Sequence, residues 1–148
     1  MTLFVSTRGG NRISLTEALF AGLAPDGGLY VPTNLTPLPP DPPRLDSIAA
    51  TAHWASPSLF GGTDADLIDR VATAALTFPA PLVEVEPGIF ILELFHGPTH
   101  AFKDIAARFM AQLMAELDTQ DGLRTILVAT SGDTGSAVAQ AFHNLEGY

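Results

Sequence analysis

The stretch that decides the fold is IFILELFHGPTHAFKD, residues 89–104, because it joins a strand-like segment to the start of a helix. Its first seven residues, 89–95, are rich in β-branched and aromatic side chains, which is typical of β-strands. A short loop with a glycine and a proline follows at 96–99. From about Ala101 to Leu117, apolar residues recur at helical spacing, with Ile105, Phe109 and Leu113 on one face. The stretch therefore predicts a strand, a loop and a helix.

The same order recurs towards the C-terminal end. Residues 125–129 form a continuous apolar run, as expected of a strand covered on both faces. The polar stretch Ser131-Gly132-Asp133-Thr134-Gly135 then leads into a second helix. Strand, helix, strand and helix in this order predict a βαβ unit with two parallel strands. Because ligands bind at the carboxyl ends of such strands, we expect the two loops to face one crevice.

The first 80 residues have a mainly helical pattern. Ser14 and Glu17 have the spacing of a capping box, which predicts a helix with Leu15, Leu19 and Leu23 on one face. Six of the twelve prolines lie between residues 32 and 43, so this segment is expected to be stiff and extended on the surface.

Two further helices are expected, near 45–55 and from Thr63 onwards. The stretch Phe78-Pro79-Ala80-Pro81 ends the second of these helices. We therefore expect an α/β protein with a mainly helical accessory domain over 1–80 and the beginning of a parallel-sheet domain over 81–148.

Composition limits the class of function. Seven basic residues stand against sixteen acidic ones, and no cluster of Lys and Arg interrupts this balance, so binding to nucleic acid is not expected. No apolar run is long enough to span a membrane, and the N-terminal residues lack a signal-peptide pattern. Without cysteine there is no disulfide framework, and a cytoplasmic location is the expectation.

Lys103 is the only lysine in the chain. A primary amine can form a Schiff base with an aldehyde, whereas a guanidinium stays protonated. At the first turn of a helix the dipole disfavours a cation, and neighbouring Phe102 and Ala106 would add desolvation, so both effects favour the nucleophilic amine. The alternative, a surface lysine paired with Asp104 or Asp133, stays open.

The loop Ser131 to Gly135 combines glycines, hydroxyl groups and the free amides of a helix N-terminus. These groups suit a carboxylate or a phosphate. The alternative is an ordinary turn in which a serine or an aspartate caps the helix.

Other chemistries lack their signatures. His96 and His100 are four residues apart, but Gly97 and Pro98 lie between them, so they do not share a helical face and no metal site is expected. Glu84 and Glu86 are interpreted as solvated side chains. A serine-hydrolase elbow, G-x-S-x-G, is absent.

Four segments resemble threonine synthases, in the same order along the chain. Residues 93–104 resemble the cofactor-lysine motif of that family, and residues 129–135 resemble its second signature. Residues 7–10 with 24–32, and the junction at 78–81, are similar to its N-terminal part. One departure is His100, at a position that is often leucine in the family, which concerns the packing of the lysine loop.

The resemblance implies a fold-type II enzyme, similar to the β subunit of tryptophan synthase, that uses pyridoxal 5′-phosphate. It further implies that Lys103 forms a Schiff base with the cofactor, and that Phe102 and Asp133 contact the cofactor. Many relatives have Asn where Asp133 stands, so the role of Asp133 is left open. The substrate carboxylate would be held by the second loop, at Ser131, Gly132, Thr134 and Gly135.

The implied reaction converts the small molecule O-phospho-L-homoserine and water to L-threonine and phosphate. Threonine synthases are much longer than this chain, so we expect an N-terminal fragment that does not turn over alone. A non-catalytic module that binds the cofactor or phosphate, and another fold-type II lyase such as a dehydratase, stay open as alternatives. The oligomeric state is left open as well.

Overall fold

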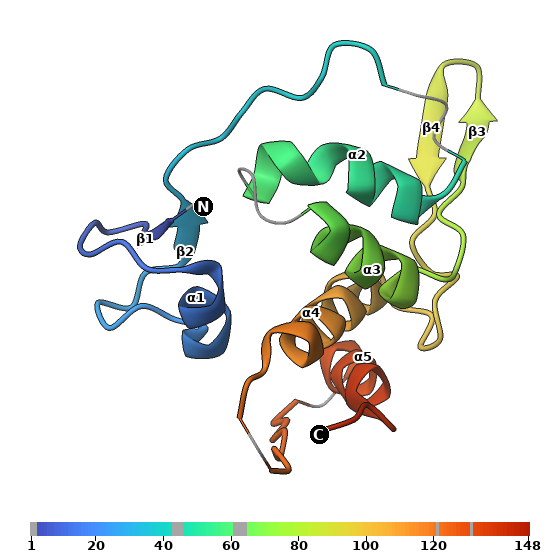
Figure 1. The fold of residues 1–148 in the computed structure, drawn as a ribbon. Helices are drawn as coiled ribbons and strands as arrows, with labels where there is room; N and C mark the ends of the chain where they lie inside the picture. The colour runs from blue at the N-terminus through green and yellow to red at the C-terminus, as the bar shows by residue number, and fades with distance from the viewer. Residues whose placement is uncertain (1–2, 43–45, 61–64, 121, 131) are drawn as a thin grey trace.

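A computed structural model describes residues 3–42, 46–60, 65–120, 122–130 and 132–148. Figure 1 shows a small N-terminal unit beside a stack of helices, with a β-hairpin at the far side of the stack. The elements in chain order are β1 (Phe4–Ser6), α1 (Leu15–Ala21), β2 (Tyr30–Pro32), α2 (Ile48–Phe60), α3 (Ala65–Ala75), β3 (Leu82–Glu86), β4 (Ile89–Leu92), α4 (Lys103–Leu117) and α5 (Asp133–Phe142).

The N-terminal unit consists of α1 and the antiparallel pair of β1 and β2. The predicted capping box is confirmed: the Glu17 amide donates to Ser14 Oγ at 3.2 Å, and the Ser14 amide donates to Glu17 Oε2 at 2.8 Å. The helix is shorter than its apolar pattern, because it ends at Gly22. Leu23 therefore lies outside the helix and is 61% exposed.

Helix α2 runs past the predicted end of its pattern and contains Pro57. Proline has no amide hydrogen to donate to the carbonyl four residues earlier, which belongs to His53. The Ser56 hydroxyl donates to that carbonyl instead, at 2.9 Å, so the helix continues through the proline. The predicted helix start at Thr63 lies outside the described residues, and α3 buries Leu67, Ile68 and Val71.

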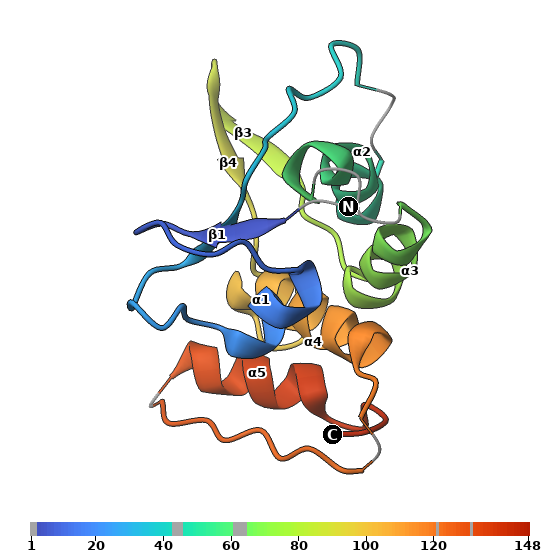
Figure 2. The same ribbon diagram turned by 60° about the vertical axis from the view of Figure 1, so that its left-hand side comes forward.

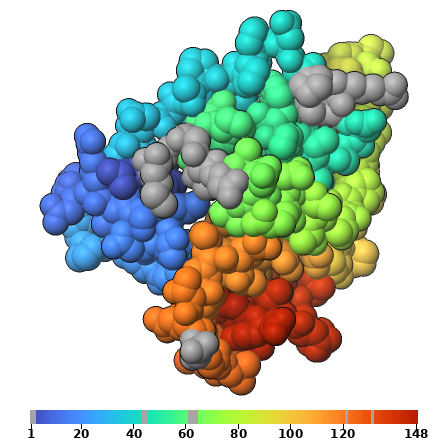
Figure 3. Space-filling view, viewed as in Figure 1, coloured from blue at the N-terminus to red at the C-terminus, as the bar shows by residue number. Residues whose placement is uncertain are grey.

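Helix α4 is the centre of the helical stack. Its predicted face contributes Leu113 to a cluster with Leu67, Ile68 and Val71 of α3. A second face, which the sequence pattern did not predict, packs Ala107 and Ala111 against α5. Their small side chains let the two helices approach closely. Figure 3 shows the helices as successive layers, from green through orange to red.

The predicted parallel pair of strands is wrong for the described residues. Strand β4 confirms a strand within 89–95, but it pairs with β3 in an antiparallel hairpin. Residues 125–129 form no strand, and Leu127 is 91% exposed. A buried parallel strand needs a neighbouring strand and cover on both faces. Among the described residues, nothing supplies either for 125–129.

Strand β3 was missed by the sequence analysis. Residues 82–86 alternate in polarity after Val83, and the turn at Pro87 and Gly88 carries a φ of +78° at the glycine. The alternation and the Pro-Gly pair are hairpin signals that could have located this strand. Glu84 and Glu86 are exposed, as interpreted, and Glu84 Oε1 accepts the Gly88 amide at 2.8 Å.

The division of the chain near residue 80 stays a prediction. Helices from both sides of it share one hydrophobic cluster, because Leu113 of α4 packs against α3. The Arg108 guanidinium also donates through Nε to the Ala75 carbonyl at 2.7 Å. Among the helices that the structure describes, none is long and apolar enough to cross a membrane.

Candidate active-site amine

Lys103 is the first residue of α4, and its side chain is half-buried. Its Nζ lies 4.4 Å from the centroid of the Phe102 ring, which is 61% exposed. Within the described part of the chain, no carboxylate oxygen lies within 4.0 Å of Lys103 Nζ. The alternative of an ion pair with Asp104 or Asp133 is therefore wrong, and the amine is available to another partner.

Asp104 is directed into the loop that precedes Lys103. The side chain is fully buried. Its Oδ2 accepts the Thr99 amide at 2.8 Å, and its Oδ1 accepts the Thr99 hydroxyl at 2.6 Å. A Cβ atom on Gly97 would lie 2.4 Å from Asp104 Oδ2, so only glycine fits there. From the sequence Asp104 is expected only as an ion-pair partner, and no pattern there indicates these contacts with the loop.

The two histidines of the lysine loop have local partners. His100 has a φ of +57°, a left-handed conformation in which histidine is enriched among non-glycine residues. Its Nδ1 lies 3.2 Å from the Phe95 carbonyl oxygen, so this departure from the family motif is accommodated within the loop. His96 Nε2 lies 2.7 Å from Glu93 Oε2. No group of three metal-ligating side chains occurs among the described residues.

The second predicted loop, at the start of α5, is exposed in its described residues 132–134. Helix α5 begins at Asp133, and its N-cap is Gly132, which gives no side-chain capping bond. Asp133 is thus inside the helix, so the alternative with aspartate as the cap is wrong, and Ser131 lies outside the described residues. Gly132, Asp133 and Thr134 are exposed. The amides of Asp133 and Thr134 donate to no other described residue, as an anion site requires.

Gly135 explains how the second loop approaches the helix. A Cβ atom on Gly135 would lie 2.4 Å from Thr130 Cγ2, so the glycine lets the incoming segment pass close to the first turn of α5. Just before it, the Gly132 amide donates to Thr130 Oγ1 at 3.4 Å.

Both loops lie at the same end of a helix pair. Figure 2 shows α4 and α5 side by side and running in the same direction, so Lys103 and Asp133 begin their helices at one end. The Arg108 guanidinium joins the two helices by donating through Nη1 to Gln140 Oε1 at 2.9 Å. The two loops therefore lie at one end of the helix pair, and the crevice expected between them stays a prediction. No described contact joins Lys103 to Asp133.

A polar anchor after α4 was not predicted. The Arg124 guanidinium donates to both oxygens of Asp118, with Nη2 3.0 Å from Oδ1, and the Tyr148 hydroxyl donates to Oδ2 at 3.2 Å. The hydrogen bond from Arg124 is the main reason why the pKa of Asp118 falls to about 2. Burial is the main reason why the pKa of Tyr148 is raised. Tyr148 is thirty residues from Asp118, which is too far for a local pattern to link them.

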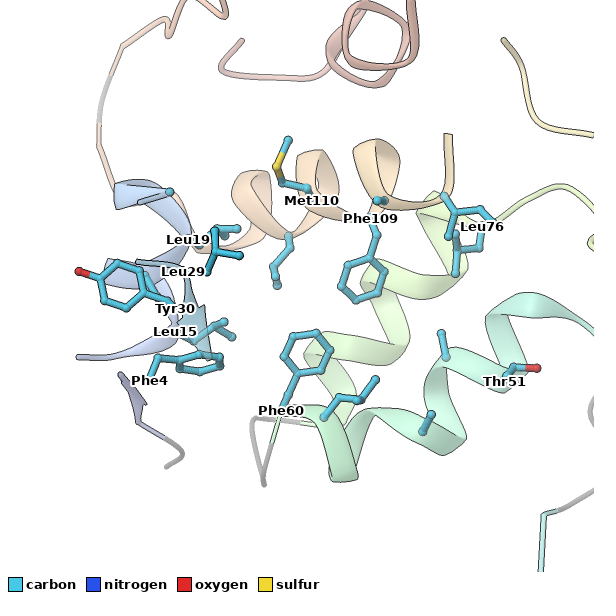
Figure 4. Close-up of a pocket in the computed structure, with 18 of the residues that line it drawn as sticks. Phe4, Leu15, Leu19, Leu29, Tyr30, Thr51, Phe60, Leu76, Phe109 and Met110 are labelled. Atoms are coloured by element: carbon cyan, nitrogen blue, oxygen red, sulfur yellow. The ribbon is translucent and has the colours of Figure 1, made fainter. Parts of the chain in front are cut away.

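An apolar pocket of about 720 Å³ that Lys103 does not line lies between the N-terminal unit and helices α2 and α4 (Figure 4). Aromatic and aliphatic side chains dominate its wall, including Phe4, Leu15, Leu19, Phe60 and Phe109. Neither Lys103 nor any residue of the second loop lines it.

The chain resembles proteins of one kind throughout its length. A sequence family described as "Threonine synthase N terminus" matches residues 3–51. The threonine synthase of Haemophilus influenzae is 43% identical over 144 residues, covering 91% of this chain and 32% of that protein.

Solved structures give the same result. The crystal structure of threonine synthase from Brucella melitensis, bound to pyridoxal phosphate, is 39% identical with a TM-score of 0.85, covering 99% of this chain and 34% of that one. The crystal structure from Escherichia coli is 38% identical with a TM-score of 0.83, covering 99% of this chain and 35% of that one. These matches confirm the predicted fold class. The chain spans about a third of the length of its relatives.

Proposed function

The chain matches the N-terminal third of threonine synthases in sequence and fold, and from that premise we propose that it supplies the reactive amine of such an enzyme. The observation that carries the proposal is the state of Lys103. It is the only lysine, it starts a helix next to a braced loop, and no described carboxylate pairs with it. A primary amine is the group that bonds to an aldehyde carbon, and no described ion pair occupies this one.

The reaction we propose for the whole protein is the conversion of O-phospho-L-homoserine and water to L-threonine and phosphate. It is a carbon–oxygen lyase reaction with pyridoxal 5′-phosphate as the cofactor. The residues present fit this cofactor, because the half-buried Lys103 amine stands over an exposed aromatic ring with no described acidic partner. When bound, the cofactor supplies an electron sink for the carbanion formed at the substrate Cα.

Lys103 would have two tasks. It would hold the aldehyde carbon of the cofactor and, once the substrate amine has replaced it there, move protons at Cα and Cβ of the substrate. Phe102 and Asp133 would contact the cofactor. Their positions at the beginnings of α4 and α5 support this assignment, since both helices start at the same end of the pair.

The second loop would bind the substrate carboxylate. Gly132, Thr134 and Gly135, with Ser131, would present the amides of the first turn of α5 to it. Two observations support this assignment. The amides of Asp133 and Thr134 have no described acceptor, and nothing lies within 4 Å of the position that a Gly132 Cβ atom would occupy.

The chain alone is not proposed to turn over. It spans about a third of the length of its relatives, and by the family resemblance the groups that bind the cofactor phosphate and the pyridine nitrogen lie outside this sequence. We further propose a cytoplasmic location and a small-molecule substrate as the partner. Purified 148-residue chain that made threonine from O-phospho-L-homoserine would contradict the fragment proposal.

A chimera tests the proposed reaction. This chain would replace the matching N-terminal third of the E. coli threonine synthase, and bound cofactor absorbance would report whether the chimera has assembled. We expect phosphate release from O-phospho-L-homoserine, and none from the same chimera carrying Lys103→Arg, because a guanidinium stays protonated. An assembled chimera that leaves this substrate intact would contradict the proposal.

The same chimera distinguishes the proposed reaction from the two alternative functions. A chimera that deaminates L-serine or L-threonine but releases no phosphate from O-phospho-L-homoserine would indicate a dehydratase. Cofactor binding without turnover of any of these substrates would indicate a non-catalytic module.

A further inference from the structure

Asp104 is an unusual group to bury. Its side chain is fully inaccessible, and no described cation lies within 4.0 Å of its carboxylate. Burying a carboxylate is unfavourable unless hydrogen bonds compensate for the lost water. Here the compensation comes from Thr99, which donates both its amide, at 2.8 Å, and its hydroxyl, at 2.6 Å. The first turn of α4 adds a favourable field for an anion.

The contacts of Asp104 gather the lysine loop around one point. Gly97 lies against the carboxylate without room for a Cβ atom, and Thr99 is bonded to both of its oxygens. The backbone closes the turn, because the Asp104 amide donates to the Ala101 carbonyl at 3.0 Å. Residues 97 to 101 are therefore fixed relative to the first turn of α4.

This fixation sets the direction of the neighbouring side chain. Successive residues of an α-helix point about 100° apart around the axis, since one turn takes 3.6 residues. With the Asp104 carboxylate directed into the loop, Lys103 must leave the helix on another side. There its Nζ lies 4.4 Å from the centroid of the Phe102 ring.

We propose that Asp104 is the positioning residue of Lys103, clamping residues 97–101 through Thr99 so that the amine is held at a fixed site before any cofactor arrives. This rests on the proposed function, in which Lys103 is the reactive amine. Asp104 touches no reacting atom in this account and acts only through the loop and the first turn of α4.

The single lysine makes a direct test practical. Reductive methylation with ¹³C-formaldehyde labels Lys103 and the α-amine of the chain, which differ in chemical shift, so one side-chain signal reports the amine. The Phe102 ring should move that signal upfield of free dimethyl-lysine. Phe102→Leu removes the ring and should abolish the upfield displacement. This result would identify the ring as the cause of the displacement.

The variants separate positioning from general stability. Asp104→Asn and Thr99→Val should lose the upfield displacement, and should capture pyridoxal phosphate under borohydride about tenfold more slowly at Lys103, as expected for a misplaced amine. Thr99→Ser keeps the hydroxyl and should restore both readouts. Val71→Ala, which opens a cavity in a separate cluster, should lose stability but keep both readouts.

An undisplaced Lys103 signal in the wild-type chain, or a displacement unchanged in Asp104→Asn and Thr99→Val, would overturn the positioning role. If Asp104→Asn does not fold, the pair Thr99→Val and Thr99→Ser decides. A displaced wild-type signal without any capture of pyridoxal phosphate at Lys103 would contradict the proposed function and leave the positioning of the amine standing.

Discussion

The two loops at the amino ends of α4 and α5 are built in different ways. The lysine loop, residues 96–103, is folded onto the buried Asp104 carboxylate through Thr99 and Gly97. The second loop, Ser131 to Gly135, contains the exposed cap Gly132, which makes no side-chain bond, and the first amides of α5 have no described acceptor. The loop before Lys103 is therefore held by the chain's own residues, whereas the first amides of α5 stay open for the anion that we propose they bind.

The largest expected effect compares one glycine from each loop. Gly97→Ala would place a Cβ atom 2.4 Å from Asp104 Oδ2, and we expect a loss of about 3 kcal/mol in the free energy of unfolding, the upper range for overpacking. Gly132→Ala meets nothing within 4 Å and has an extended φ of −155°, so it should stay within about 0.5 kcal/mol. Urea denaturation measures both. Equal losses of unfolding free energy in the two variants would contradict the proposed difference between the loops.

Two threonine substitutions, one in each loop, compare the same two loops with a smaller expected effect. Thr99→Val leaves the buried Asp104 Oδ1 without its hydroxyl donor, and should cost about 1 to 2 kcal/mol of unfolding free energy. Thr134→Val, exposed in the first turn of α5, should change it by less than about 0.5 kcal/mol. Thermal unfolding of the two variants under one buffer makes the comparison. A Thr134→Val loss as large as that of Thr99→Val would show that the second loop is braced as well.

The smallest effect concerns the anchor that holds the approach to the second loop. The pKa of Asp118 is lowered from 3.8 to about 2 in the folded chain, mainly by its bond from Arg124. A lowered folded pKa gives stability that is present above pH 3.8 and is lost as the pH falls towards 2. The melting temperature of the wild-type chain should therefore exceed that of Asp118→Asn near pH 5, and the difference should shrink between pH 4 and pH 2.

A melting-temperature difference between the wild-type chain and Asp118→Asn that stays constant from pH 5 to pH 2 would contradict the anchor.

Local signals in the sequence were sufficient for the parts of the fold that depend on neighbours in the chain. The Ser14 capping box, the start of α4 beside Lys103 and a strand within 89–95 all follow from short-range patterns. The parallel pairing of 125–129 failed because an apolar run specifies burial and not the partner that provides it. Within this chain, the described residues offer that run no neighbouring strand.

The site was predictable in its chemistry and less so in its support. A lone lysine beside a motif predicts Lys103 as the candidate amine, whereas the contact of Asp104 with the loop depends on an irregular turn that returns Thr99 to a carboxylate five residues later. No helical or strand period produces that contact. The same holds for the bond between Asp118 and Tyr148, which are thirty residues apart.

The most direct test of the central claim is to locate the amine that captures the cofactor. The 148-residue chain would be incubated with pyridoxal phosphate, reduced with borohydride and digested, and the peptides weighed by mass spectrometry. The account predicts a cofactor adduct on the peptide containing Lys103, and its loss in Lys103→Arg. Capture confined to the α-amine of the chain, with Lys103 unmodified, would contradict it.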